Sequence, residues 1–162
     1  MAYVTYSPSK SVFFANCYKD YFLDSDISEY DEYSISQSNT NILNVFIEQR
    51  LIATVCELDI DMHELSITKK QLGNLRWGWL VQRPNENQLL TFDSNNNLIL
   101  ENRVVAKFSG NYNMNLLLLI WKLIKGERPL KNNLKLEFDE TVIEPSFAFC
   151  LLFKELCRRC NS

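Results

Sequence analysis

Histidine and glycine are both scarce in this chain. Among its 162 residues there are one histidine, His63, and four glycines. Histidine is the side chain that titrates near neutral pH without perturbation, and glycine lets a backbone wrap closely around a phosphate group. Their scarcity argues against proton-transfer catalysis and against a nucleotide-binding loop. We therefore expect a protein that binds, with no catalytic residues, no bound metal and no cofactor.

Long apolar runs are missing as well. The run at residues 116–121, like every other in the sequence, is far shorter than the ~20 residues that span a bilayer. Residues 1–6 have neither the basic start nor the apolar stretch of a signal peptide. From these absences we expect no membrane partner and a cytoplasmic location.

Cysteine is present but follows no recognisable framework. The five cysteines are odd in number and unevenly spaced, which is typical of reduced residues in a cytosolic protein. Cys157 and Cys160 match C-x-x-C, yet no second such pair supplies the remaining ligands of a zinc site. They also lie at the end of a predicted helix, whereas redox thiols favour a helix start. We interpret the cysteines as small apolar residues.

The composition itself predicts one folded domain over residues 1–162. Hydrophobic residues make up 46% of the chain, aromatic residues 12% and charged residues 23%, which suits a packed core. The net charge of −3 argues against a general nucleic-acid coat, which carries a basic balance. No linker rich in glycine, serine or proline divides the chain.

Hydrophobic spacing predicts an α+β fold. We expect an antiparallel sheet of about five to six strands, with two C-terminal helices packed on one face and an N-terminal helix at the edge. Residues 23–40 are expected to form a loop, and residues 42–60 fit either a helical stripe or, at 51–60, a buried strand, which the β-branched residues favour. The predicted strands cover residues 2–6, 77–82, 88–92, 98–101, 103–108 and 134–138, and the predicted helices cover 10–22, 112–125 and 145–159.

An acidic segment is the leading candidate for a binding site. Residues 20–32 contain six carboxylates, no lysine and no arginine, with tyrosines interleaved. Such a surface can steer a basic partner by its charge while the tyrosines supply contact area, as in an immunity or inhibitor protein. The structural alternative is a solvated loop whose tyrosines fold back on the core. The predicted partner-binding residues are Asp24, Asp26, Glu29, Tyr30, Asp31, Glu32 and Tyr33.

A basic stretch near residue 130 suggests a second function. Five cations with one intervening carboxylate, Glu127, could contact phosphates in a small non-catalytic subunit of a nucleic-acid-handling complex. Nucleic acid would then be a partner only as part of that complex, and the structural alternative is a set of solubilising lysines at a helix end. The residues of this predicted patch are Lys122, Lys125, Arg128, Lys131 and Lys135.

The third hypothesis is a metal- or thiol-dependent enzyme. Asp59, Asp61 and His63 would share one face of a strand, and Glu64 follows them directly. No distant motif offers further ligands, and an acidic turn explains the segment more simply. We therefore predict no metal here.

Overall fold

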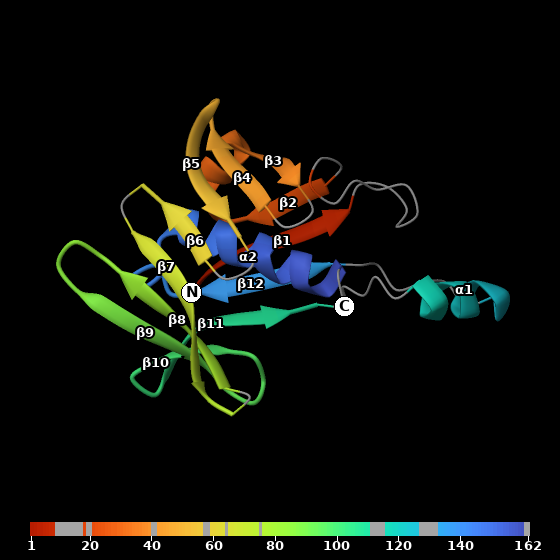
Figure 1. Ribbon diagram of the computed structural model, residues 1–162. Helices are drawn as coiled ribbons and strands as arrows, with labels where there is room; N and C mark the ends of the chain where they lie inside the picture. Colours follow the sequence, from red (N-terminus) through yellow and green to blue (C-terminus); the bar gives the residue numbers. More distant parts are fainter. Residues whose placement is uncertain are drawn as a thin grey trace.

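One antiparallel sheet runs through most of the described chain (Figure 1). The computed structural model describes residues 1–8, 18, 21–39, 42–56, 59–63, 65–74, 76–110, 116–126 and 133–160. Within them the sheet has twelve strands in the order β2-β1-β12-β11-β10-β9-β8-β7-β6-β5-β4-β3, so β2 and β3 are its two edges. The strands are β1 (Ala2–Pro8), β2 (Tyr21–Ser25), β3 (Tyr33–Asn39), β4 (Ile42–Ile47), β5 (Arg50–Val55), β6 (Asp59–Met62), β7 (Ser66–Gly73), β8 (Arg76–Gln82), β9 (Asn87–Phe92), β10 (Leu98–Leu100), β11 (Arg103–Ser109) and β12 (Leu134–Phe138).

The strands form because their apolar residues alternate and tight turns separate them. In β1, Ala2, Val4 and Tyr6 are buried while the residues between them are half-exposed. The turn between β4 and β5 places Glu48 and Gln49 at φ values of 47° and 71°. Two consecutive residues with positive φ match the right-handed twist of the strands they join.

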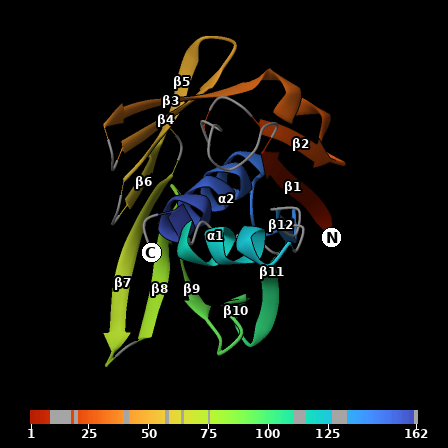
Figure 2. The same ribbon diagram turned by 90° about the vertical axis from the view of Figure 1, so that its right-hand side faces the viewer.

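Helix α2 (Pro145–Cys160) fills the inside of the curved sheet. Figure 2 shows the sheet curling around this helix, which contacts β12 and β5. Phe149, Leu152, Phe153 and Leu156 are completely buried there. Removing such large side chains from water supplies roughly 2–3 kcal/mol each, so α2 carries a large share of the core.

A row of aromatic rings on α2 connects the two edges of the sheet. Phe153 lies 5.3 Å from Tyr21 of β2, measured between ring centroids, and Phe149 lies 4.8 Å from Tyr33 of β3. Phe149 and Phe153 are themselves 4.8 Å apart. Side chains of α2 therefore contact both edge strands. β2 and β3 themselves form no backbone hydrogen-bond ladder with each other.

Helix α1 (Leu116–Ile124) projects away from the sheet (Figure 1). Its exposed side chains include Leu117, Ile120, Trp121 and Ile124, which follow the i, i+3, i+4, i+7 spacing of one helical face. This helix thus presents an apolar stripe outward, and in Figure 2 it lies in front of α2 as a separate element.

These observations correct the predicted fold class. The α+β arrangement with about five to six strands is wrong, because the described chain forms a twelve-stranded sheet with only two α-helices. The predicted helix over 112–125 exists in part as α1, but it does not pack on the sheet.

The segment predictions near the N-terminus also need correction. The helix predicted over residues 10–22 is wrong at its end, because residues 21 and 22 begin β2. Residues 9–17, 19 and 20 lie outside the described part. The predicted loop over 23–40 contains β3, and the helical alternative for 42–60 is replaced by β4, β5 and β6.

Candidate partner-binding surface

The acidic segment joins the two edges of the sheet. The short 3-10 helix η1 (Ser28–Glu32) follows β2 and leads directly into β3, although these strands are at opposite ends of the strand order. Figure 1 shows β2 and β3 on the same side of the molecule. The predicted acidic residues therefore lie between two sheet edges.

The carboxylates of this segment point to solvent. All five predicted acidic residues are exposed, and none of them forms an ion pair with a lysine or arginine of the described chain. The Tyr3 backbone N–H donates a hydrogen bond of 3.0 Å to Asp26 Oδ1, which fixes the end of β2 against β1. These residues, named the acidic face below, are Asp24, Asp26, Glu29, Asp31 and Glu32.

The two predicted tyrosines lie in the core instead. Tyr30 is 3% exposed and Tyr33 is 8% exposed, and both rings contact Phe149. The Tyr30 hydroxyl donates a hydrogen bond of 2.6 Å to the carbonyl oxygen of Pro145, the first residue of α2. Burial raises the pKa of both tyrosines above the usual value, so their hydroxyls stay neutral. They hold η1 on the core, so the carboxylates alone among the predicted binding residues are exposed.

The sequence analysis missed an exposed aromatic residue beside the acidic face. Phe22 of β2 is 66% exposed and lies on the same outward side of the strand as Asp24. The pairing of Phe22 with Ser7 and of Asp24 with Thr5 fixes this orientation. Strand alternation is the signal that would have revealed Phe22, but it was obscured by assigning the residue to a helix.

The predicted basic patch is divided between two elements. Lys122 lies on α1 and Lys125 directly follows it, with the Lys125 ammonium group 3.6 Å from the centroid of the Trp121 ring. Lys135 lies on β12 and forms an ion pair of 2.7 Å with Glu137. That hydrogen bond raises the pKa of Lys135. Two further members of the predicted patch, Arg128 and Lys131, lie outside the described residues.

The acidic group around His63 forms no metal site among the described residues. Asp59, Asp61 and His63 are all exposed, and no cluster of three or more potential ligands occurs in the part of the chain that the structure describes. Glu64 lies outside that part. On the neighbouring strands β7 and β8, the Lys69 ammonium group lies over the Trp77 ring, 4.7 Å from its centroid.

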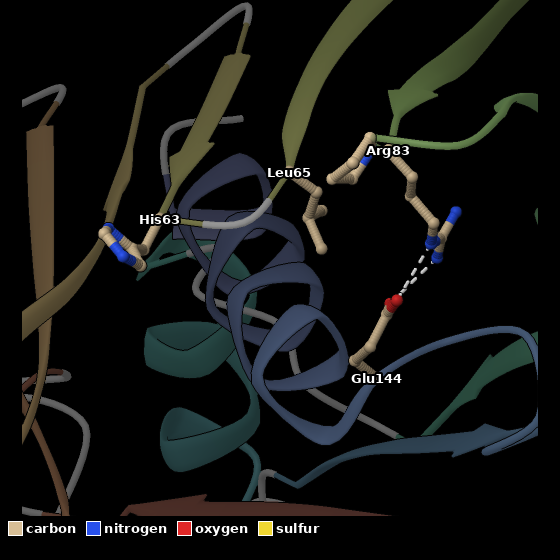
Figure 3. Close-up of a pocket in the computed structure, with 5 residues that line it drawn as sticks. His63, Leu65, Arg83 and Glu144 are labelled. Atoms are coloured by element: carbon tan, nitrogen blue, oxygen red, sulfur yellow. Dashed lines mark hydrogen bonds and ion pairs between the residues drawn. The ribbon is translucent and has the colours of Figure 1, made fainter.

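His63 borders an open hollow of about 420 Å³ that is lined by Leu65, Arg83, Pro84 and Glu144 as well (Figure 3). Both carboxylate oxygens of Glu144 accept hydrogen bonds of 2.9 Å from Arg83. His63 lies on the opposite side of the hollow from this pair.

The Arg83 side chain makes two further hydrogen bonds. Its guanidinium group donates to the carbonyl oxygen of Val142 at 3.0 Å and to Gln88 Oε1 at 2.6 Å. With four donors engaged, Arg83 acts as a clamp between β8, β9 and the start of α2. The Arg83 guanidinium group is thus engaged in structural hydrogen bonds.

Cys56 and Cys150 are free thiols in unreactive surroundings. Cys150 is completely buried, and desolvation raises its pKa to about 12. Burial followed by the hydrogen bond with Asp59 also raises the pKa of Cys56. The thiolate is the reactive form of cysteine, and a raised pKa keeps both of these side chains protonated. Neither is therefore an activated nucleophile. The Cys157 Sγ lies 3.1 Å from the Tyr18 hydroxyl, which ties the end of α2 to the N-terminal part of the chain.

Comparison with protein-family models, with curated proteins and with solved structures found no match to this chain. Among the described residues, neither helix is both long enough and apolar enough to cross a bilayer.

Proposed function

We propose that this chain is a non-enzymatic, cytoplasmic protein-binding module that binds a basic partner protein and neutralises it, as an immunity or inhibitor protein does. One observation carries the proposal: the end of β2 and η1 display five exposed carboxylates that form no ion pair with any lysine or arginine of the described residues. The buried Tyr30 and Tyr33 anchor that segment, so its charges are presented at a fixed position. Preorganised charge of one sign accelerates association with an oppositely charged partner.

The test compares the acidic face with an equal change of charge elsewhere. The variant Asp31→Lys/Glu32→Lys reverses two charges of the acidic face, and Glu101→Lys/Glu140→Lys reverses two exposed charges outside it. The wild-type protein and both variants are immobilised and used to retain binding proteins from an extract of the source cells. We expect the wild type and the control to retain the same basic protein, and the acidic-face variant to lose it.

The salt dependence of the association rate then separates electrostatic steering from nonspecific adhesion. The association rate of the purified partner should fall as ionic strength rises, and it should fall less steeply for Asp31→Lys/Glu32→Lys. An acidic partner, or a partner bound by all three proteins with the same salt dependence, would contradict the proposal.

The exposed stripe of α1 favours a second candidate function, that of a small subunit in a nucleic-acid-handling complex. Leu117 and Trp121 are 79% and 57% exposed, and such a stripe is the pattern with which a helix enters a groove of another protein. Lys122 and Lys125 would then be brought near phosphates by the assembly. Trp121→Ser should release the chain from such a complex, and Lys125→Ala should weaken its retention of nucleic acid. A complex that is unaffected by both changes would remove this candidate.

A further inference from the structure

Strand β3 has an open edge. It pairs with β4 and with no other described strand. Glu48 donates its backbone N–H to the carbonyl oxygen of Glu32 at 3.3 Å, and bonded pairs alternate along an antiparallel ladder. Ser34 and Ser36 therefore bond to β4, and the alternate residues turn their backbone groups away from it. These outward-facing residues are Tyr33, Ile35 and Gln37.

The sequence of β3 lacks the charged residues and the proline that commonly protect an edge against strand addition. Proteins guard exposed edges with lysine, proline, inward charges or very short strands. β3 spans seven residues with the sequence Tyr-Ser-Ile-Ser-Gln-Ser-Asn, which contains no charge and no proline. A bulge between Gln37 and Asn39 disturbs only its far end. The first part of β3 is thus an accessible template for a further strand.

Among the described strands, the sheet does not close on itself by pairing β2 with β3. The rings of Phe149 and Phe153 stand between β2 and β3, because they contact Tyr21 on one side and Tyr33 on the other. In the part of the chain that the structure describes, these rings contact both edge strands, and only β4 forms backbone hydrogen bonds with β3.

We propose that an extended strand of the basic partner adds to the open edge of β3, antiparallel to it, and that lysine or arginine residues near the C-terminal end of that strand contact η1. This inference rests on the proposed function and specifies how the same site holds its partner. Main-chain hydrogen bonds to the strand would supply affinity, and the acidic face would supply specificity. The antiparallel direction follows from the sheet, in which every described pair of neighbouring strands is antiparallel.

Charge favours this occupant over a second copy of the chain. β3 begins directly after Asp31 and Glu32, whose carboxylates attract cations and repel another molecule with a net charge of −3. A basic strand therefore suits both the hydrogen-bonding edge and the charge next to it.

The probe is an acetylated and amidated peptide in which threonine and valine alternate, followed by a short run of lysines at the C-terminal end. Its matched control has the same sequence with N-methyl groups on alternate backbone amides, which keeps the charge but blocks pairing with a strand. Isothermal titration with the full chain should show binding of the unmodified peptide. Methylation should weaken binding by at least about tenfold, because several backbone hydrogen bonds are lost together.

A substitution in β3 tests the same edge from the side of the protein. Gln37→Pro removes an outward-facing N–H, and Gln37→Ala keeps that N–H while removing the same exposed side chain. The proline variant should bind the unmodified peptide at least about tenfold more weakly than the alanine variant, because proline blocks pairing at an edge. Thermal unfolding establishes that both variants fold, and the comparison of the two peptides on the wild-type protein does not depend on either variant.

The outcomes separate this inference from the proposed function. If both peptides bind equally and Asp31→Lys/Glu32→Lys abolishes binding, the acidic face binds cations and strand addition is wrong. If neither peptide binds, or if the charge reversal leaves binding unchanged and methylation has no effect, both proposals fail. A dimer that light scattering detects for the wild type and that Gln37→Pro abolishes would show that a second copy occupies the edge, which also overturns the inference.

Discussion

Tyr30→Phe tests how the acidic segment is held on the core. In the wild type the buried hydroxyl of Tyr30 donates a hydrogen bond of 2.6 Å to the Pro145 carbonyl oxygen. Phenylalanine keeps the ring packed against Tyr33 and Phe149, so no cavity is created. We expect the free energy of unfolding to fall by about 1 kcal/mol at neutral pH, the usual net contribution of one such bond.

The same substitution should change the response to alkaline pH. Burial raises the pKa of Tyr30 above the value of 10.0 that the unfolded chain has. Above pH 10 the unfolded state therefore loses a proton that the folded state keeps, and stability declines. The contribution of Tyr30 is complete below pH 10.0 and is lost above it, at about 1.4 kcal/mol for each pH unit. Phenylalanine has no proton to lose, so this part of the decline disappears.

The two effects have opposite signs, which makes the assay decisive. Urea unfolding followed by tryptophan fluorescence should show the Tyr30→Phe protein as less stable at neutral pH, with an unchanged m-value. The difference should shrink above pH 10 and vanish near pH 11, where the alkaline loss of the wild type roughly equals one hydrogen bond. A difference in unfolding free energy that stays constant from neutral to alkaline pH would refute the reasoning.

Three further substitutions probe other parts of the structure. Arg83→Met should lower the free energy of unfolding by about 2–3 kcal/mol, because Glu144 loses its ion pair in a half-buried place, and urea titration measures the loss. Gly78→Ala should cost about 1–3 kcal/mol in the same assay, because a Cβ would lie 2.6 Å from the Leu90 carbonyl oxygen, and an unchanged midpoint would contradict this. Trp121→Ser should change stability by less than about 0.5 kcal/mol while reducing retention on a hydrophobic column, since the side chain is exposed; a large loss of stability would show that α1 packs on the body.

Strands with large apolar residues between clear turn signals could be predicted from the sequence. Residues 77–82 and 88–92 lie within β8 and β9, as predicted, because these short apolar runs are bounded by proline, asparagine and aspartate. β3 was missed because Tyr33 and Ile35 are its only apolar residues and serine occupies its outward positions. Polar edge strands lack the hydrophobic signal on which the prediction depends.

Turns without glycine explain another part of the error. Glu48 and Gln49 adopt positive φ between β4 and β5, and Glu101 and Asn102 do the same between β10 and β11, at 49° and 65°. Glutamate and glutamine rarely take this conformation, so a hairpin near residue 48 was hard to predict. The two flanking strands then resembled one helical stripe.

At the candidate site, charge could be predicted but burial could not. The acidic residues were expected to be exposed because carboxylates are rarely buried without a partner. Tyrosine is intermediate in its preference for the core, so the burial of Tyr30 and Tyr33 depended on where α2 would lie. That position is set by long-range packing with Phe149, which no local pattern near residue 30 reveals.

The acidic face and the open edge are more selective together than either would be separately. An uncharged edge strand pairs readily with any extended chain, including another copy of itself. Carboxylates alone attract any cation and distinguish poorly among basic proteins. Placing Asp31 and Glu32 immediately before β3 penalises strands that bring negative charge to that end and favours those that bring positive charge. Because α2 keeps the two sheet edges apart, the packing of the core and the selectivity proposed for this surface have a common structural origin.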